Sequence, residues 1–262
     1  MPVDPPSPTE MRAQLTELLQ AHQALTERLR QGQASFQRIA RSVWRVQEEE
    51  RSRFARELHD GVGHNLTAML HLIKEALAAL PDDPRCRHAR DELVHAQSIG
   101  DTTLQDTRAL SRLLRPQILD DLGLEPALRW LARSFSETHG IDTHLDYHEP
   151  PVGIDADRST LVFRLVQEAL ANTAKHASAR HVAIAFDGRG ERASLRVRDD
   201  GNGCDVEAAL ARGRHGGSSG LGGMRDRARL FGGSLQFEST PGAGFGMSVS
   251  FPLSDASPGA SP

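Results

Sequence analysis

The chain of 262 residues has little cysteine and no long apolar run. Its two cysteines, Cys86 and Cys204, are far apart and follow no metal-ligand spacing, which excludes a disulfide scaffold and a zinc module and suits a reducing compartment. No stretch approaches the roughly 20 uncharged apolar residues that a membrane span needs. The first ten residues also lack the basic patch and apolar core of a secretory signal. We therefore expect a soluble, cytoplasmic chain with no membrane span.

An excess of one charge is also missing, because 31 basic residues stand against 35 acidic ones and the formal net charge is −4. Such a chain has no strong positive field that would attract nucleic acid, so direct DNA binding is a poor interpretation. The length fits one large domain or, more naturally, two.

Proline is absent from residues 11–80, which are rich in Ala, Leu, Gln, Glu and Arg, and this predicts one very long helix or two in tandem. Apolar residues recur every three or four positions from Phe36 to Leu80. One partner within the chain cannot bury so long and narrow a stripe, so we expect a helical bundle or dimeric coiled coil. Prolines 81 and 84 end this helix, and a second amphipathic helix follows over roughly Arg87 to Leu114. Two such hairpins would make a four-helix bundle.

The remainder of the chain alternates between helices and short strands, which predicts an α/β domain with an antiparallel or mixed sheet. Helices are expected at Leu124 to Thr138 and Asp157 to Ala177, and strands at Thr143 to Tyr147, His181 to Asp187, Ala193 to Asp199, Ser234 to Ser239 and Gly246 to Phe251. Arg212 to Gly223 is a predicted Gly/Ser-rich loop. The tail Ser254 to Pro262 is predicted to be disordered.

One histidine stands at the margin of the apolar stripe of the first helix. His59 follows Leu58, and the residues four positions before and after it, Ala55 and Gly63, are small. This spacing predicts an imidazole on a helix face where small neighbours leave room for a large ligand or domain. The alternative is an ordinary exposed histidine among i, i+4 charge pairs.

The charged residues beside this histidine fit a role as a nucleophile. A neutral imidazole is a competent nucleophile for phosphorus, and the adjacent Asp60 would orient the ring and stabilise the imidazolium. Arg56, one turn earlier, would offset the charge of a phosphoryl group.

A second group of polar residues lies on the predicted helix Asp157 to Ala177. Its members recur at helical spacing and comprise an acid, an amide and basic groups: Glu168, Asn172, His176, Arg164 and Lys175. Carboxylate and amide oxygens suit Mg²⁺, directly or through water, and Lys175 or His176 would meet phosphate oxygens. A solvated helix face is the alternative.

Two glycine-rich segments complete the pattern. Asp199 and Asp200 close a predicted strand and precede Gly201 and Gly203; glycine lets the backbone approach a flat ligand, and a carboxylate there would accept from an exocyclic amine. An acidic hairpin turn is the alternative. The second segment, Ser218 to Arg225, runs into a helix whose free N–H groups would favour phosphate.

In this order, the groups resemble a bacterial two-component sensor histidine kinase of the subfamily typified by the nitrate/nitrite sensors and by the sensor that regulates a fatty-acid desaturase. The most specific stretch is Glu48 to Asp60, and the likeness covers roughly residues 45 to 254. It implies an α-helical hairpin that forms a dimeric four-helix bundle, followed by an α/β sandwich of the Bergerat type, the ATP-binding fold shared with the gyrase, Hsp90 and MutL ATPases.

The resemblance also implies roles for single residues in phosphoryl transfer. His59 would be the phosphoacceptor and Asp60 its activating acid, with Arg56 nearby. Asp60 and His64 match a pattern tied to dephosphorylation of the partner. Asn172 would hold Mg²⁺, with Glu168 ordering a water or the metal.

For the nucleotide, the resemblance implies that Asp199, not Asp200, binds the adenine amine. The pocket and its lid would be shaped by further residues: Gly201, Gly203, Gly220, Leu221 and Gly223, with Lys175 and His176 near the phosphates. Two positions depart from the family pattern, Ser218 at the start of the lid motif and Phe245 after the last glycines. Either would weaken phosphate contacts.

The implied protein is a homodimer that uses ATP and Mg²⁺ and passes a phosphoryl group to a response regulator with a receiver domain and a helix-turn-helix output domain. No sensor domain or membrane span precedes the helix at residue 11 in this sequence, so the signal would come from a separate soluble partner, from the N-terminal helix or from a further part of the protein. The expected segments are an N-terminal signalling helix (1–45), a dimerisation and phosphotransfer domain (46–116), an ATP-binding domain (117–254) and a disordered tail (255–262).

Two interpretations from other classes remain open: a Bergerat ATPase or protein-serine kinase of the anti-sigma type, which would have no use for the hairpin, and a non-catalytic dimeric scaffold. His139, His144 and His148 also permit a metal site, although a solvated strand edge is favoured because no further ligands are evident. We interpret Cys86 and Cys204 as incidental.

Overall fold

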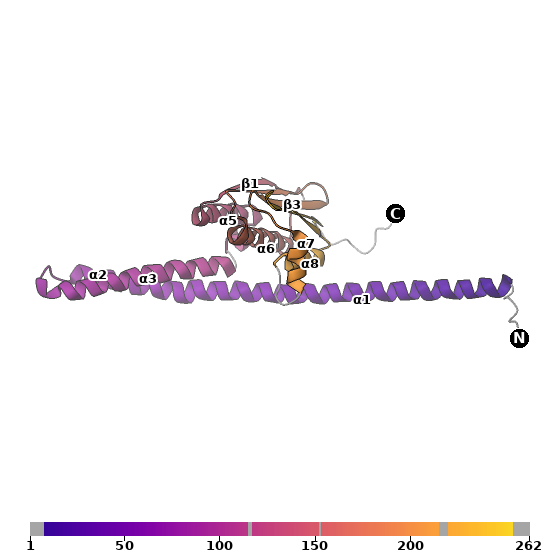
Figure 1. Ribbon diagram of the computed structural model, residues 1–262. Helices are drawn as coiled ribbons and strands as arrows, with labels where there is room; N and C mark the ends of the chain where they lie inside the picture. The colour runs from indigo at the N-terminus through magenta and orange to yellow at the C-terminus, as the bar shows by residue number, and fades with distance from the viewer. Residues whose placement is uncertain (1–7, 115–116, 152, 215–219, 254–262) are drawn as a thin grey trace. The chain divides into compact units, whose positions relative to one another are not determined.

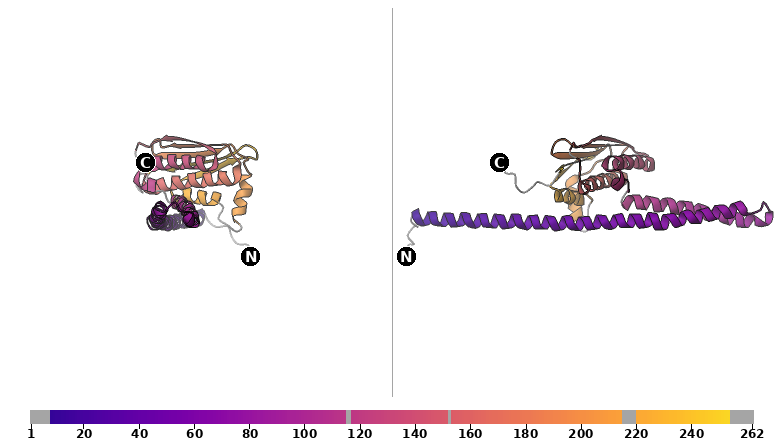
Figure 2. Two further views of the ribbon diagram at one scale, coloured as in Figure 1. Left: turned by 90° about the vertical axis from the view of Figure 1, so that its left-hand side faces the viewer. Right: turned by 180° about the vertical axis from the view of Figure 1, so that it is seen from behind.

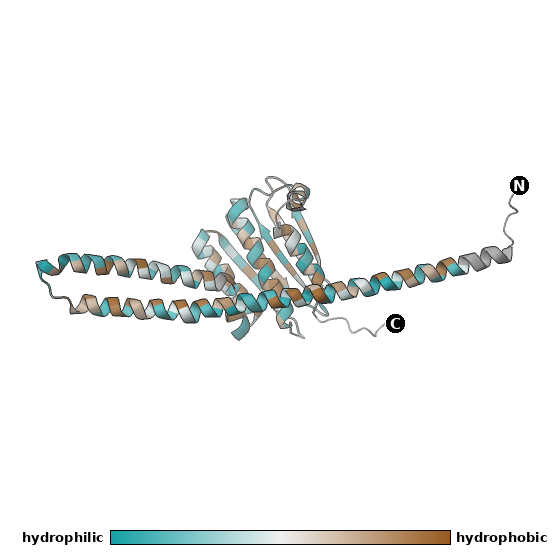
Figure 3. Cartoon of the chain, turned by 90° about the horizontal axis from the view of Figure 1, so that it is seen from below, coloured by the Kyte–Doolittle hydropathy of each residue, from teal (hydrophilic) through white to brown (hydrophobic). Residues whose placement is uncertain are grey.

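A computed structural model describes residues 8–114, 117–151, 153–214 and 220–253 (Figure 1). The chain divides into two compact units, Met1–Gln47 and Glu48–Pro262. The described part of the first unit is helical throughout and belongs to α1 (Pro8–Glu57). Its apolar side chains recur along the helix, as the brown positions in Figure 3 show, and many are exposed, Phe36 at 71% and Ile39 at 65%.

The long helix does not break at the histidine motif. After α1 the backbone passes through a π-helical turn, η1 (Leu58–Gly63), into α2 (His64–Ala79). Glu57, Gly63 and His64 all keep right-handed helical angles, which confirms the prediction of a continuous or tandem helix. A π turn inserts one residue into the helical repeat, so side chains five positions apart become neighbours.

The second helix returns as the sequence predicts. Leu80 leaves the helical conformation, and the Asp83 side chain accepts a 2.8 Å hydrogen bond from the backbone N–H of Arg85, which caps the short 3₁₀ turn η2 (Pro84–Cys86). From there α3 (Arg87–Leu114) runs back beside α2. The helical hairpin is confirmed.

The rest of the second unit is built on one five-stranded sheet (Figures 1 and 2). Its strands are β1 (Asp142–His148), β2 (His181–Asp187), β3 (Arg192–Asp199), β4 (Ser234–Ser239) and β5 (Phe245–Pro252), in the spatial order β1-β2-β3-β5-β4. The β1–β2 pair is parallel and the other pairs are antiparallel, so the predicted mixed sheet is confirmed.

Helices cover one face of this sheet (Figure 2). The helices of this part are α4 (Gln117–Asp121), α5 (Leu124–His139), α6 (Ala156–Asn172) with its π-helical end η3 (Thr173–Ala177), α7 (Val206–Arg214) and α8 (Gly220–Leu230). The core is formed by side chains with almost no exposed surface, among them Leu128, Phe163, Phe186, Leu195 and Phe251. The alternating burial along β2 and β3 follows from the two-residue repeat of a strand packed on one face.

Two expectations are wrong. The predicted loop Arg212 to Gly223 is helical at both ends, because Arg212–Arg214 close α7 and Gly220–Gly223 open α8. α7 begins at Val206, where the Asp205 carboxylate accepts from the backbone N–H of Ala208 at 3.0 Å, a capping signal that the glycine content obscured. Ser218 and the tail Ser254–Pro262 lie outside the described residues.

The polar row on α6 is also different from the prediction. Arg164, expected in line with Glu168 and Asn172, is buried and bonded to Glu48. The alternative of a solvated helix face holds only for the end of the row, because Lys175 and His176 are exposed whereas every residue from Arg158 to Val166 is buried. The sequence pattern could not show this, since the partner of Arg164 lies 116 residues away.

Candidate functional site

A cavity of about 500 Å³ lies between the end of α6, the end of β3 and the first turn of α8. Its lining is contributed by segments far apart in the sequence: Asn172, Thr173, His176, Ala177, Asp199, Gly203, Cys204, Ala209, Gly220, Leu221 and Phe245. Six of the nucleotide-binding candidates chosen from the sequence are therefore brought together: Asn172, His176, Asp199, Gly203, Gly220 and Leu221.

Asp199 is the buried carboxylate of this cavity, with 5% of its surface exposed. One carboxylate oxygen accepts hydrogen bonds from the backbone N–H of Gly201 at 2.9 Å and of Phe245 at 3.2 Å. The other accepts from the hydroxyl of Thr173 at 3.1 Å. The side chain is thus fixed in place by three donors, and a carboxylate so held presents acceptor capacity to a ligand with N–H donors.

Asp200, the next residue, has a different function in the fold. Its carboxylate accepts from the backbone N–H groups of Arg180 and His181, and from the His181 ring at 2.8 Å. These hydrogen bonds, first of all the one from the His181 backbone, hold the pKa of Asp200 far below its ordinary value. Asp200 therefore ties the start of β2 to the end of β3, while Asp199 faces the cavity.

Asn172 and Glu168 meet the first residue of α8. A Cβ added to Gly220 would collide with the Glu168 carboxylate and come within 3.5 Å of the Asn172 amide nitrogen, so a larger residue here would displace the end of the Glu168 side chain. The Asn172 amide nitrogen is buried and has no hydrogen-bond partner in the described structure. A buried amide without a partner at a cavity wall fits a polar ligand, and a neighbouring carboxylate fits a divalent cation.

The other candidates lie around this cavity in different ways. Gly203 has a φ of 60° and its Cβ position is filled by the Thr240 carbonyl, so the turn requires glycine. Gly201 contributes its N–H to Asp199 rather than lining the cavity. Lys175 and Gly223 are not among the lining residues either; Lys175 is exposed, and Gly223 lies against the Arg227 side chain.

Several lining residues were not chosen from the sequence. Thr173 binds Asp199 directly, and Cys204, interpreted as incidental, lies in the wall. Phe245 also lines the cavity, and its backbone N–H donates to Asp199. The apolar or small side chains of Ala177 and Ala209 carry no chemical signal, so only the fold could identify them.

The second site is the histidine motif on the π turn η1. The His59 side chain is 48% exposed, and its Nδ1 lies 3.0 Å from a carboxylate oxygen of Asp60. Because a carboxylate only accepts, Nδ1 carries the proton and donates it to Asp60. The lone pair then resides on Nε2, so the geometry selects the tautomer with a nucleophilic Nε2.

His64 lies beside this ring, with the two ring centroids 5.8 Å apart in an edge-on arrangement. Its Nδ1 lies 2.9 Å from the Asp60 backbone carbonyl, which fixes the same tautomer and leaves Nε2 of His64 as a free base. A small pocket is lined by His59, His64, Gly63, Thr67, Thr107 and Arg108. The two histidines are five positions apart in the sequence, and the π turn brings residues at this spacing together.

Two residues that the sequence predicts beside the His59 ring, Ala55 and Arg56, do not line its pocket. Ala55 is 2% exposed and its carbonyl accepts from the Ser111 hydroxyl at 2.8 Å, so it faces the hairpin interior and does not clear a surface. Arg56 donates to the Ser52 hydroxyl at 2.8 Å and is not among the residues of the His59 pocket. The cation that does line the pocket is Arg108 of α3.

The described residues contain no cluster of three or more His, Cys, Asp or Glu side chains that could hold a metal ion. His144 and His148 are both exposed on β1. No helix among the described residues is long and apolar enough to cross a lipid bilayer.

Family comparisons match both sites. Residues 50–119 match the family described as histidine kinase. Residues 157–255 match the family described as histidine kinase-, DNA gyrase B-, and HSP90-like ATPase. The chain belongs to the two-component sensor histidine kinases. The two matches occur in the order that the sequence predicts, and the match over the hairpin favours a histidine kinase over a Bergerat serine kinase or a scaffold.

Curated relatives are sensor kinases of the same kind. The chain is 33% identical over 211 residues to the sensor histidine kinase MctS of Rhizobium johnstonii, covering 80% of this chain and 45% of MctS. It is 31% identical to the signal transduction histidine-protein kinase/phosphatase DegS of Brevibacillus brevis, covering 80% and 53%. For the kinase/phosphatase UhpB of Salmonella typhimurium the identity is 34%, covering 89% and 45%. The chain therefore spans about half the length of these relatives.

Among solved structures, the histidine kinase domain of a blue-light activated kinase from Erythrobacter litoralis EL346 is similar, with a TM-score of 0.42 and 20% identity over 72% of this chain and 94% of that one. The family assignment rests on the sequence matches rather than on this likeness. The Bergerat-type ATPase family and the observed sheet with helices on one face agree on the expected fold class.

Proposed function

We propose that this chain is an ATP-dependent protein-histidine autokinase that phosphorylates His59 and passes the phosphoryl group to an aspartate of a response regulator. The observation that carries the proposal is the 3.0 Å contact between Nδ1 of His59 and Asp60, which leaves Nε2 as the nucleophile on a half-exposed ring. The match of residues 50–119 to the histidine kinase family supports it.

In the proposed reaction, Nε2 of His59 forms a bond to the γ-phosphorus of ATP, the bond from that phosphorus to the bridging oxygen breaks, and ADP leaves. Asp60 holds the Nδ1 proton and stabilises the imidazolium that forms. Arg108, which lines the same pocket from α3, is placed to neutralise phosphoryl charge, the role that sequence reasoning gave to Arg56. The protein thus acts mainly by positioning and charge neutralisation.

The nucleotide would bind in the cavity around Asp199. We propose that the Asp199 carboxylate accepts from the adenine amine, and that Gly201, Gly203, Gly220, Leu221 and Gly223 form the adenine pocket and the lid. Lys175 and His176 would meet the phosphates. Asn172, through its amide oxygen, and Glu168 would hold Mg²⁺, which supplies charge neutralisation of the phosphates, and the Glu168 carboxylate against Gly220 supports this fit. The unpartnered Asn172 amide nitrogen would donate to a phosphate oxygen.

We further propose a phosphatase activity toward the same regulator. His64 has its Nδ1 fixed by the Asp60 carbonyl, so its Nε2 is free to accept a proton from a water that attacks an aspartyl phosphate. Two of the relatives are named kinase/phosphatases. The regulator would carry a receiver domain and a helix-turn-helix output domain, so the kinase need not contact DNA.

A homodimer would complete the hairpin. Val94, Ile99 and Leu110 of α3 are each more than half exposed in the single chain, and a second hairpin would cover them in a four-helix bundle. We propose the segments 1–45 for signalling, 46–116 for dimerisation and phosphotransfer, 117–254 for ATP binding and 255–262 as a disordered tail. The proposed setting is the cytoplasm, with the signal supplied by the N-terminal helix, by a separate sensor or by a further part of the protein.

The decisive experiment is labelling with [γ-³²P]ATP. Wild-type protein is expected to acquire acid-labile, base-stable phosphate, and His59→Gln to acquire none while binding a fluorescent ATP analogue normally. His71→Gln, an exposed histidine of α2 beyond the pocket, is the matched control and is expected to label as the wild type does. Persistent label on His59→Gln would overturn the proposal, and serine phosphate in its place would favour the anti-sigma type.

A further inference from the structure

An arginine of α8 has a partly buried guanidinium without a partner. The Nε of Arg227 is buried and donates to no acceptor among the residues that the structure describes. No carboxylate in the described part of the chain forms an ion pair with this guanidinium either. Burial lowers the pKa of Arg227, whereas the charge of Glu168 favours its protonated form. A guanidinium stays charged in proteins, so its removal from water is costly unless a ligand supplies the acceptors.

The side chain of Arg227 is directed along α8 toward the nucleotide cavity. Gly220, Gly223 and Arg227 stand at positions i, i+3 and i+7 of α8 and so share one face of the helix. A Cβ added to Gly223 would lie 3.3 Å from a terminal nitrogen of Arg227 and 3.8 Å from its Cζ. The guanidinium therefore lies over Gly223, one turn closer to Gly220, because helix side chains lean toward the N-terminus.

The first turn of α8 is where the cavity meets a second charge. Gly220 lines the cavity, and the Glu168 carboxylate lies against it. The charge of Glu168 acts on Arg227, but the two side chains form no ion pair in the described structure, so each keeps capacity for a third group. A phosphate bound to a divalent cation satisfies both, because the cation suits the carboxylate and the phosphate oxygens suit the guanidinium.

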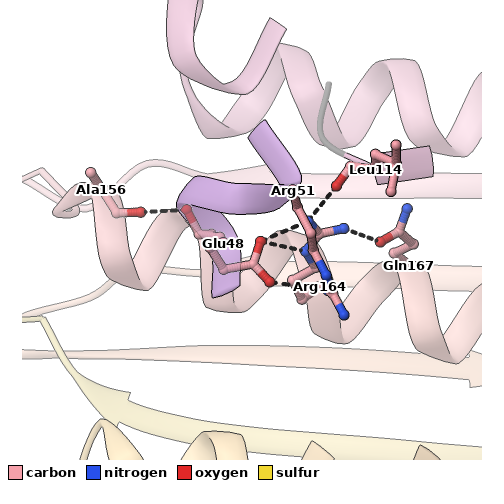
Figure 4. A network of polar contacts seen from close by, with 7 residues as sticks. Glu48, Arg51, Leu114, Ala156, Arg164 and Gln167 are labelled. Atoms are coloured by element: carbon pink, nitrogen blue, oxygen red, sulfur yellow. Dashed lines mark hydrogen bonds and ion pairs between the residues drawn. The ribbon is translucent and has the colours of Figure 1, made fainter. Parts of the chain in front are cut away.

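The acid of a neighbouring helix that also acts on Arg227 is already occupied. Glu48 of α1 contributes to the charges around this guanidinium. One oxygen of its carboxylate accepts from Arg164 at 2.9 and 2.6 Å, and the other accepts from Arg51 at 3.1 Å (Figure 4). Glu48 is therefore satisfied by two other guanidinium groups, which leaves Arg227 available to an added anion.

The position of Arg227 relative to Asp199 indicates which part of a nucleotide it would meet. Thr173 holds Asp199, the proposed partner of adenine, whereas Glu168 faces Gly220. These two residues of α6 and its end are five positions apart, about 7.5 Å at 1.5 Å per residue. The Asp199 end and the Arg227 end of the site are thus separated along α6, as the base and the terminal phosphate are separated in an extended nucleotide.

We propose that Arg227 is a catalytic residue, which binds the terminal phosphate of ATP and neutralises its charge during transfer to His59. In this step the bond from Nε2 of His59 to the γ-phosphorus forms, the bond from that phosphorus to the bridging oxygen breaks, and ADP keeps the electron pair. Arg227 stays protonated throughout. It is not among the lining residues of the cavity, so a change of rotamer brings its guanidinium to the phosphate. The proposal rests on the proposed autokinase function and adds a residue that distinguishes ATP from ADP.

The test compares the affinities of the full chain for ADP and for AMP-PNP, a non-hydrolysable ATP analogue. Both displace a fluorescent ADP analogue in the presence of Mg²⁺. Arg227→Met keeps the apolar stem and removes the charge. It is expected to weaken AMP-PNP binding about tenfold and to leave ADP binding within about twofold, because only AMP-PNP carries a terminal phosphate. The initial rate of autophosphorylation at saturating ATP is expected to fall about 10- to 100-fold.

Thermal unfolding guards against a variant that merely misfolds. Without nucleotide, Arg227→Met is expected to unfold at the wild-type temperature or above it, because the substitution removes a partly buried cation that has no partner. Addition of Mg²⁺ and AMP-PNP is expected to raise that temperature less than in the wild type. The matched control is Arg229→Met, at an exposed arginine of the same helix, and it is expected to behave as the wild type does in each measurement.

The possible outcomes separate this proposal from the proposed function. Equal weakening of ADP and AMP-PNP binding in Arg227→Met would overturn the proposal, because Arg227 would then support the site only structurally. Unchanged AMP-PNP affinity, or an unchanged rate at saturating ATP, would overturn it as well. Absence of label on His59 in the wild type would instead contradict the autokinase function, whatever the two nucleotide affinities.

Discussion

The two parts of the second unit differ in how completely they bury their apolar side chains. In the sheet part the strands and helices enclose a core, and Leu195, Phe186 and Phe251 have essentially no exposed surface. In the hairpin, Leu70 and Leu104 are buried, but Leu72 is 65% exposed and Ile99 55%. Among the described residues, every exposed large apolar side chain lies at or before Leu122.

This difference teaches that the two parts obtain their stability in different ways. A sheet with helices on one face buries its own core and needs no second chain. A two-helix hairpin has too little surface to do so, and its remaining stripe is available for another copy. The functional groups follow the same division, because Asp199 is buried and hydrogen-bonded whereas His59 and Arg108 are exposed to an incoming partner.

The largest effect is expected from truncation of the sheet core. Leu195→Ala should lower the free energy of unfolding by about 2–5 kcal/mol, because it leaves a cavity in close packing. Ile99→Ala in the hairpin should leave this unfolding transition unchanged and weaken self-association. Urea unfolding followed by tryptophan fluorescence, together with sedimentation, checks both. Equal losses of unfolding free energy would break the comparison.

The next largest effect is expected on nucleotide binding, where the neighbouring carboxylates Asp199 and Asp200 should differ. Asp199→Asn should weaken nucleotide binding by about 10- to 100-fold, the equivalent of the roughly 1.5–3 kcal/mol of hydrogen bonds to a charged group. Asp200→Asn alters only the junction of β2 and β3 and should keep binding within about twofold. Titration with a fluorescent ATP analogue measures both, with circular dichroism as the folding control. Comparable weakening by both substitutions would refute the assignment of Asp199.

A smaller effect is expected at the exposed phosphoryl site. Arg108→Gln should slow autophosphorylation about tenfold without changing ATP affinity, because a charge-assisted contact in a solvated pocket contributes about 1–2 kcal/mol. Arg56→Gln, whose guanidinium is bonded to Ser52, is the matched control and should be nearly silent. If Arg56→Gln slowed autophosphorylation more than Arg108→Gln did, the phosphoryl-binding residue would be Arg56.

The smallest effect at neutral pH concerns Tyr147, which stacks on Phe186 with ring centroids 5.0 Å apart. Burial, followed by the charges of Glu149 and Glu125, raises the pKa of Tyr147 to about 12. The unfolded pKa is about 10, so the neutral phenol stabilises the fold fully below pH ~10, and this contribution is lost as the pH rises through ~12.

The chain has a single tyrosine, so its phenolate absorbance can be followed directly. We expect a midpoint near 12 in the folded chain and near 10 in denaturant. A folded midpoint near 10 would show that the ring is solvated.

Much of the architecture could be predicted from local patterns. The strands β2 and β4 have the predicted bounds, and α3 runs over the predicted residues, because alternation and helical periodicity are properties of contiguous segments. The loop prediction at Arg212 to Gly223 was wrong because glycine content is a weak guide where a capping residue and tertiary packing favour a helix.

The sequence by itself determined the order of the parts and the chemical types at each site: His59 followed by Asp60, and Asp199 between a strand and two glycines. Only the tertiary structure decided that Arg108 rather than Arg56 lines the pocket of His59, that Thr173 and Phe245 hold Asp199, and that Arg164 binds Glu48. The physical reason is the distance along the sequence over which each effect acts. Dihedral preferences and periodicity act over a few residues, whereas these contacts join segments as much as 116 positions apart and exist only once the core has formed.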